Sequence, residues 1–370
     1  MSTSPSTASF LAGTAASLEA HSPVAASDAR AAQIPLQTFN LPAFPAEAFS
    51  AGLTALILTS DIKLAEYQSL LEQPFSVPDL PPTIKSLTLE LFSLGYPPGF
   101  LTAVGKRLPG LTSLTLYSQL LAGTTPHSRD DALTFVRCQS QLREIHLLDV
   151  FASEGFYAHL AASVGPALRF LEINFTYRHS DPDFLQNLPR QEVAPWVRGG
   201  LLGLTASISR PDGTGDDDDR EGTELGILPV QTKDSGELVE RLRRVGGEMV
   251  MLDLTMFQLD LESVGRVVDA CPQLKMLGIT VGLETGWREL FALLGTEGRG
   301  RGIEVLEVVA APGVAFVASV QGGEAAGLSQ EVLVAVGAAG CPELKRVKVS
   351  ILRTHGEQWV KDGGEWALRA

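Results

Sequence analysis

The sequence predicts an α/β solenoid, in which each repeat adds one strand to a curved parallel sheet and one helix to the outer side of that sheet. The first observation is a recurring pattern, L-x-x-L-x-L, with apolar residues at its first, fourth and sixth positions. The second is that the apolar period lengthens between copies from two residues to about three and a half, as it does where strands alternate with helices. The third is that, in the regular stretches, successive copies start 25 to 31 residues apart, which suits a strand and a crossover helix.

The repeated unit is clearest at residues 271–279 (CPQLKMLGI) and again at 341–349 (CPELKRVKV), where a Cys-Pro pair precedes it. One such unit arises easily by chance, whereas a recurring one is the signature of a repeat array. Cys271 and Cys341 occupy the same place in the two copies, where a small apolar side chain fits a buried turn. The units start at Leu53, Ile84, Leu111, Leu142, Leu168, Met249, Leu274, Ile303 and Leu344.

The segments between the units predict helices. Pro98 is favoured in a first helical turn, and Ser128 and Ser153 can cap the helices that follow them. The expected helices span residues 61–73, 98–108, 129–138, 154–164, 236–245, 260–270, 285–294 and 329–339.

Two interruptions break this rhythm. The longer one places 81 residues between the starts of the units at Leu168 and Met249, and a strand at 201–208 predicts one degenerate repeat inside it. The array then has about ten repeats. The polar segment 210–222 predicts an acidic loop insertion, and it lacks the glycine and the bidentate glutamate of a calcium-binding EF-hand loop. The second interruption contains the Gly- and Ala-rich segment 321–327, which predicts a longer loop.

The repeat pattern divides the chain into four parts. Residues 1–35 are rich in Ser, Ala, Thr and Pro without an apolar period, so we expect a disordered tail. Residues 36–50 gain apolar side chains and predict an N-terminal cap on the first repeat. Residues 51–352 make up the repeat domain. Residues 353–370 hold two tryptophans in an amphipathic stretch and predict a C-terminal cap.

Charge and composition disfavour several classes of function. The formal net charge of −14 disfavours a nucleic-acid partner, because affinity for phosphates comes from Lys and Arg. Three cysteines form neither a paired metal motif nor an even disulfide framework, which favours a reducing compartment. The first 29 residues lack the basic residues of a targeting signal, and the apolar run 305–320 is too short and too interrupted to span a bilayer. We expect a cytoplasmic protein, with the nucleus as the alternative, and neither a cofactor nor a membrane partner.

With these units the chain resembles leucine-rich-repeat proteins of the ribonuclease-inhibitor-like and cysteine-containing kind, over roughly residues 50–350. Its Cys-Pro-x-Leu-x-x-Leu segments look like the repeats that follow F-boxes in ubiquitin-ligase substrate receptors. The resemblance implies an α/β leucine-rich-repeat solenoid, with a parallel sheet on the concave side, helices on the convex side and protein partners. An F-box is not clear, because only Leu41-Pro42 resembles one and little chain precedes Leu53. The Asn or Cys that is usual after the last apolar position is replaced by Gln119, Val150, Thr176, Phe257 and Gly282.

The concave face is the predicted binding site. Because side chains alternate along a strand, the third, fifth and seventh positions of each unit face away from the helices. These positions are acidic in the middle of the array and basic at its last strand, where they hold Arg346 and Lys348. Aromatic side chains beside carboxylates suit a basic protein partner; the alternative is a solvated face with incidental charges. The candidate binding residues are Tyr117, Glu144, His146, Phe170, Glu172, Asn174, Asp253 and Thr255.

Three further functions stay open from the sequence. The first is a substrate receptor or adaptor tied to ubiquitin ligation. The second is an enzyme that uses His146 and Glu172 as an acid–base pair on adjacent strands. The third is a structural or regulatory subunit. We expect a non-catalytic protein-interaction scaffold, because the chain contains no HExxH, paired CxxC, P-loop or GxSxG motif.

Overall fold

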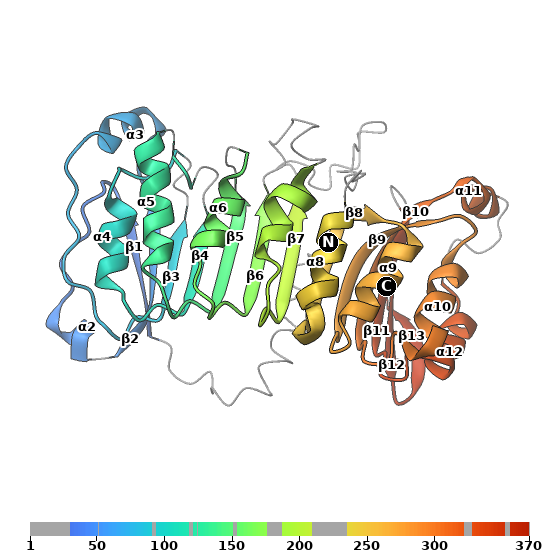
Figure 1. Cartoon of the computed structure of the whole chain (residues 1–370). Coiled ribbons are helices and arrows are strands. Elements are labelled where there is room, and N and C mark those ends of the chain that lie inside the picture. Colours follow the sequence, from blue (N-terminus) through green and yellow to red (C-terminus); the bar gives the residue numbers. More distant parts are fainter. Residues whose placement is uncertain are drawn as a thin grey trace, which may run out of the picture.

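The computed structural model describes residues 30–50, 52–90, 94–117, 121–123, 125–150, 154–175, 187–208, 235–321, 328–351 and 356–369. In these residues one sheet holds all the strands in their order along the chain, and the helices lie together on one face of it (Figure 1). This confirms the predicted α/β solenoid. The predicted acidic insertion at 210–222 lies outside the described residues, as does nearly all of the predicted loop at 321–327.

The strands from β1 to β11 are parallel, and the last two are antiparallel. The parallel strands are β1 (Arg30–Leu36), β2 (Leu53–Ser60), β3 (Ser86–Glu90), β4 (Ser113–Tyr117), β5 (Glu144–Val150), β6 (Phe170–Phe175), β7 (Gly203–Ile208), β8 (Met251–Leu259), β9 (Met276–Leu283), β10 (Val305–Pro312) and β11 (Arg346–Ile351). The antiparallel strands are β12 (Gly356–Asp362) and β13 (Glu365–Arg369).

Helical segments connect the strands. The α-helices are α2 (Ala46–Ser50), α3 (Leu64–Leu71), α4 (Phe100–Arg107), α5 (Pro126–Arg137), α6 (Phe156–Ser163), α8 (Gly236–Val245), α9 (Leu261–Ala270), α10 (Trp287–Gly295), α11 (Val314–Gln321) and α12 (Gln330–Ala339). A π-helix, η1 (Leu188–Val193), and a 3₁₀ helix, η2 (Ala194–Trp196), lie between β6 and β7. Short 3₁₀ turns follow α8 and α10 at η3 (Gly246–Glu248) and η4 (Thr296–Gly298). Strand β7 and helix α8 confirm the degenerate repeat that the sequence predicts.

The apolar positions of the repeat unit form the core. The fourth residue of each unit pairs with the fourth residue of the next, so these side chains make one continuous buried row beneath the helices. None of them is more than 1% exposed. The row consists of Leu56, Leu87, Leu114, Ile145, Leu171, Leu204, Leu252, Leu277, Leu306 and Val347.

A backbone arrangement repeats at the junctions from β3–β4 to β10–β11. The carbonyl of Lys85 accepts hydrogen bonds from two amides of the next repeat, Thr112 N–H at 2.8 Å and Ser113 N–H at 3.0 Å. Two hydrogen bonds to one carbonyl recur along the array, and they fix the offset between neighbouring repeats at the point where the strands begin to pair. The accepting carbonyls belong to Lys85, Thr112, Arg143, Arg169, Leu202, Val250, Lys275 and Glu304.

Two helices begin in a way that the sequence did not indicate. Gly99 and Gly155 precede α4 and α6 with φ of 90° and 76°, a conformation that glycine adopts freely but that leaves no side chain for capping. The caps come instead from the next repeat. The Asp131 carboxylate accepts from the backbone amides of Leu101 and Thr102, each at 3.0 Å.

The Glu192 carboxylate plays the same part at α6, where it accepts from the amides of Gly155 and Tyr157. For α5 the expected cap at Ser128 is wrong. This helix begins at Pro126, and its cap is Thr125, whose Oγ1 accepts from Ser128 N–H at 3.1 Å. The expected cap at Ser153 lies outside the described residues.

The ends of the array differ from expectation. Strand β1 starts at Arg30 and pairs in parallel with β2, so the last residues of the predicted tail belong to the sheet. The predicted C-terminal cap is a β-hairpin that extends the sheet, with Trp366 buried and Trp359 partly buried. None of the helices in the described residues has the length and apolar character needed to cross a lipid bilayer.

We predict that native protein reacts with a thiol reagent at a single cysteine. Cys138 is exposed, whereas Cys271 and Cys341 are buried. Burial raises the pKa of the Cys271 thiol to about 12 and that of Cys341 to about 11, so both stay protonated and shielded at neutral pH. Titration with Ellman's reagent should count one fast thiol in native protein and three after denaturation. Fast reaction of a second thiol would contradict this packing.

We also predict that Leu277→Ala lowers the free energy of unfolding by about 2–5 kcal/mol, because it leaves a cavity at a fully buried position. Since each repeat is stabilised mainly by its neighbours, amide hydrogen exchange should accelerate in β8 and β10 as well as in β9. Protection that is lost in β9 alone would argue against a cooperative solenoid.

Candidate binding face

The eight candidate residues lie on β4, β5, β6 and β8, on the face of the sheet opposite the helices. Strand pairing places Glu144 beside Phe170 and His146 beside Glu172, as the repeat alignment predicts. Tyr117, at the end of β4, is 43% exposed. Three adjacent strands thus present aromatic and acidic side chains together.

His146 and Glu172 form a cross-strand contact. His146 Nδ1 lies 2.8 Å from Glu172 Oε2, and the two side chains are 34% and 29% exposed. Their strand neighbours in the same row are Thr115 and Thr205. The contact fixes the direction of the Glu172 carboxylate on a partly exposed face, which suits recognition of a cationic or hydrogen-bond-donating group.

Asn174 has a supporting position. Its Oδ1 accepts from the backbone N–H of Asp149 at 3.2 Å, and its Nδ2 donates to Ser207 Oγ at 2.8 Å. Asp149 has a φ of 49°, a left-handed conformation that non-glycine residues adopt at a cost. Asn174 therefore holds the end of β5, where the register of β5 and β6 shifts.

An apolar row crosses the middle of the same face. Phe170, Gly203, Met251, Met276 and Val305 are consecutive partners on five strands. A Cβ on Gly203 would lie 2.6 Å from the Phe170 ring, so the missing side chain makes room for that ring. Met276 and Val305 are buried together, with Met251 packed against them. This row was not predicted from the sequence, although apolar third positions in three successive units indicate it.

Asp253 differs from its expected role as an exposed carboxylate. It is only 1% exposed, and Thr255 donates to its Oδ1 from the backbone N–H at 3.0 Å and from the hydroxyl at 2.8 Å. A Cβ on the neighbouring Gly278 would lie 2.7 Å from the same oxygen. Burial, reinforced by the nearby negative charge of Glu307, raises the pKa of Asp253 to about 6. Thr255 is thus hydrogen-bonded to a buried Asp253, which does not present its carboxylate to solvent.

At the basic end of the face, Lys348 forms an ion pair with Glu307 of the neighbouring strand. Lys348 Nζ donates to Glu307 Oε1 at 2.7 Å, and the Glu307 side chain is only 8% exposed. Within the described part of the chain, Glu307 Oε2 has no hydrogen-bond partner. Among the carboxylates of β5, β6, β8 and β10 on this face, those of Glu144 and Glu172 are therefore accessible, whereas Asp253 and Glu307 are buried.

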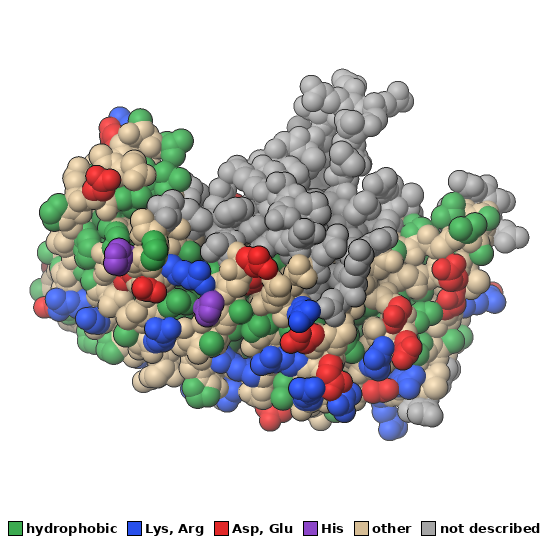
Figure 2. Space-filling view, turned by 45° about the horizontal axis from the view of Figure 1, so that its top comes forward, with side chains coloured by type: hydrophobic (Ala, Val, Ile, Leu, Met, Phe, Trp, Pro, Cys, Tyr) green, Lys and Arg blue, Asp and Glu red, His purple; other side chains and the backbone are tan. Residues whose placement is uncertain are grey.

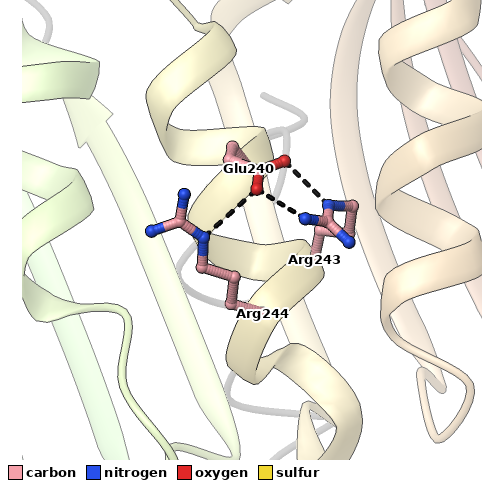
Figure 3. Close-up of polar contacts among 3 residues, drawn as sticks. All are labelled: Glu240, Arg243 and Arg244. Carbon is pink, nitrogen blue, oxygen red and sulfur yellow. Dashed lines mark hydrogen bonds and ion pairs between the residues drawn. The ribbon is translucent and has the colours of Figure 1, made fainter.

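The helix side carries charges of both signs, interspersed over the surface (Figure 2). On α8, Glu240 accepts from Arg243 Nη2 at 2.7 Å and from Arg244 Nε at 3.1 Å (Figure 3). These hydrogen bonds, that of Arg243 foremost, lower the pKa of Glu240 to about 2. Among the described residues, no group of three His, Cys, Asp or Glu side chains is placed to hold a metal ion.

The strand order and the repeated unit give the chain the fold of a leucine-rich-repeat solenoid. No protein-family model matches the sequence, and no curated protein sequence gives a match. Among solved structures, the fold is similar to the leucine-rich repeat-containing protein LegL7 from Legionella pneumophila, with a TM-score of 0.43 and 15% identity over 88% of this chain and 92% of LegL7. It is also similar to a chain of the Rad7 and Elc1 complex in yeast, with a TM-score of 0.37 and 13% identity over 82% of this chain and 78% of that one.

We predict that Asp253 makes the protein less stable as pH rises. Its pKa in the folded state, about 6, exceeds the ordinary value of 3.8. The folded chain therefore binds more protons than the unfolded chain between these values, and the free energy of unfolding falls as pH increases through this window. Asp253→Asn removes this dependence while its amide oxygen can still accept from Thr255.

Denaturant unfolding of both proteins between about pH 4 and pH 7 measures the effect. The stability of Asp253→Asn relative to the parent should increase over this range by up to roughly 3 kcal/mol. The difference between the two proteins isolates this carboxylate from other groups that titrate. A difference that stays constant with pH would be inconsistent with a buried, ionisable Asp253.

Proposed function

We propose that this protein is a non-catalytic scaffold that binds a protein partner with a basic segment on the concave face of β4, β5 and β6. One observation carries the proposal: Tyr117, Glu144, Phe170 and Glu172 lie on three adjacent strands and remain accessible, whereas the acidic groups of β8 and β10 are buried. Aromatic anchors flanked by carboxylates suit a Lys- or Arg-bearing peptide, through ring packing and charge-assisted hydrogen bonds.

The parts of this patch have separate roles in the proposal. Tyr117 and Phe170 supply contact area at a small cost in conformational entropy. Glu144 and Glu172 supply charge, and the hydrogen bond from His146 orients the Glu172 carboxylate. Asn174 maintains the local backbone instead of contacting the partner. The patch requires neither a nucleic acid nor a membrane, and we propose a cytoplasmic or nuclear location on the grounds given by the sequence.

A narrower version of the proposal is a substrate receptor or adaptor in ubiquitin ligation. Its support is the pair of Cys-Pro repeat units, in which Cys271 and Cys341 are buried at equivalent positions. Affinity purification of the tagged protein tests this version separately. Recovery of a cullin adaptor would support it, and recovery of partners without any ligase component would count against it.

The scaffold proposal predicts that charge reversal on this patch reduces binding. The double variant Glu144→Lys/Glu172→Lys replaces attraction by repulsion, and recovery of the partner should fall about tenfold or more. Its residual binding should also depend less on salt. Glu172→Lys removes the hydrogen bond with His146, so a stability loss of about 1 kcal/mol is expected without unfolding.

The matched control is Glu72→Lys/Glu343→Lys, which changes the net charge equally at two exposed positions away from the concave face. Quantitative mass spectrometry of purifications at several salt concentrations should show the partner retained by the control and lost by the patch variant. Equal retention by both variants would refute binding of the partner at this patch. Equal loss from both would assign binding to net charge instead of a localised site.

A further inference from the structure

The sheet ends at an edge that has no neighbour among the described strands. Strand β13 pairs with β12 through a two-residue turn at Gly363 and Gly364, whose φ values are 55° and 98°. In such a hairpin the residues that flank the turn, Asp362 and Glu365, form a hydrogen-bonded pair, and bonded and non-bonded pairs then alternate. The open side of β13 therefore carries the backbone N–H and C=O groups of Trp366 and Leu368.

This end of the solenoid also exposes apolar side chains. Leu368 on β13 is 54% exposed and Val334 on α12 is 57% exposed, whereas Trp366 is buried where β13 packs on α12. Terminal repeats of a solenoid normally present a polar outer face, because no further repeat covers them. An edge strand that no other described strand pairs with, beside exposed leucine and valine, is a surface suited to another strand.

We propose that β13 pairs with β13 of a second copy of this chain, so that the two sheets continue across a two-fold axis at Ala367. In an antiparallel arrangement centred there, Trp366 lies opposite Leu368 of the second copy. Both residues have outward-facing backbone groups, so each of these pairs exchanges two hydrogen bonds. Trp366 of the second copy then covers the exposed side chain of Leu368.

The charges of the strand favour this register. Charged residues on an edge strand usually prevent pairing with another sheet. Here the sequence Glu365-Trp-Ala-Leu-Arg369 is self-complementary when read antiparallel, because each Glu365 lies opposite Arg369 of the second copy. Within its own hairpin Glu365 lies opposite Asp362, a like-charge pair that is unfavourable across strands. The arginine of the second copy offsets that repulsion.

The interface is independent of the proposed binding face. It lies at the C-terminal end of the array, whereas the patch of aromatic and acidic side chains lies on β4, β5 and β6. The contact area of one short strand and the net charge of −14 favour a weak, reversible dimer. Two copies joined in this way present two concave faces.

Sedimentation equilibrium of the full chain over the micromolar range tests the proposal. The parent protein should dimerise reversibly, and Glu365→Arg or Arg369→Glu alone should weaken the dimer about tenfold or more, because each places like charges opposite each other at both ends of the interface. The combined variant Glu365→Arg/Arg369→Glu should restore dimerisation. A mixture of the two single variants should form the heterodimer, because opposite charges then face each other at both ends of the interface.

A backbone variant separates strand pairing from side-chain contact. Leu368→Pro removes the outward-facing N–H together with the leucine side chain but no hydrogen bond of the hairpin, and it should leave a folded monomer, as checked by circular dichroism. Leu368→Ala keeps that N–H and should weaken the dimer less. A parent protein that stays monomeric throughout the range overturns the proposal. So does a combined charge variant that fails to dimerise while its circular dichroism is unchanged.

Discussion

The double hydrogen bond at the start of strands β4 to β11 is the contact on which the array depends. From Lys85 to Glu304, one carbonyl in each repeat receives two amides of the next repeat. A shift by one residue would turn every side chain of a strand to the opposite face, and this contact sets the alignment at the first strand residue. The buried row that runs through Leu277 and the concave columns both follow from it.

The fold was predictable because its information is local and repeated. The apolar positions of units such as 271–279 specify a strand with one buried face, and their recurrence specifies how strands stack. The residues facing the concave side followed from alternation alone, which is why the contact of His146 with Glu172 was predictable as a strand-to-strand neighbour. Strand β1 was missed because its composition resembles that of the segment before it.

Burial was much harder to predict. Asp253 and Glu172 occupy the same position in their repeats, yet one carboxylate is buried and the other is partly exposed. Part of the difference lies in the neighbours: Gly278 lets Asp253 lie against the next strand, whereas His146 holds Glu172 within reach of solvent. Such pairings join residues far apart in sequence. The caps from Asp131 and Glu192 were missed for the same reason, because capping patterns in a sequence are sought within one turn of the helix.

Those caps also affect the order in which helices α4 and α6 are completed during synthesis on the ribosome. The amides at the start of α4 find their acceptor in Asp131, about one repeat later in the chain, and those of α6 find theirs in Glu192. During synthesis at roughly 5–20 residues per second, each of these helices must wait a few seconds for the next repeat to emerge from the ribosome. Until then the first amides of α4 and α6 lack these acceptors, and a pause in translation extends the time for which the two helices stay uncapped.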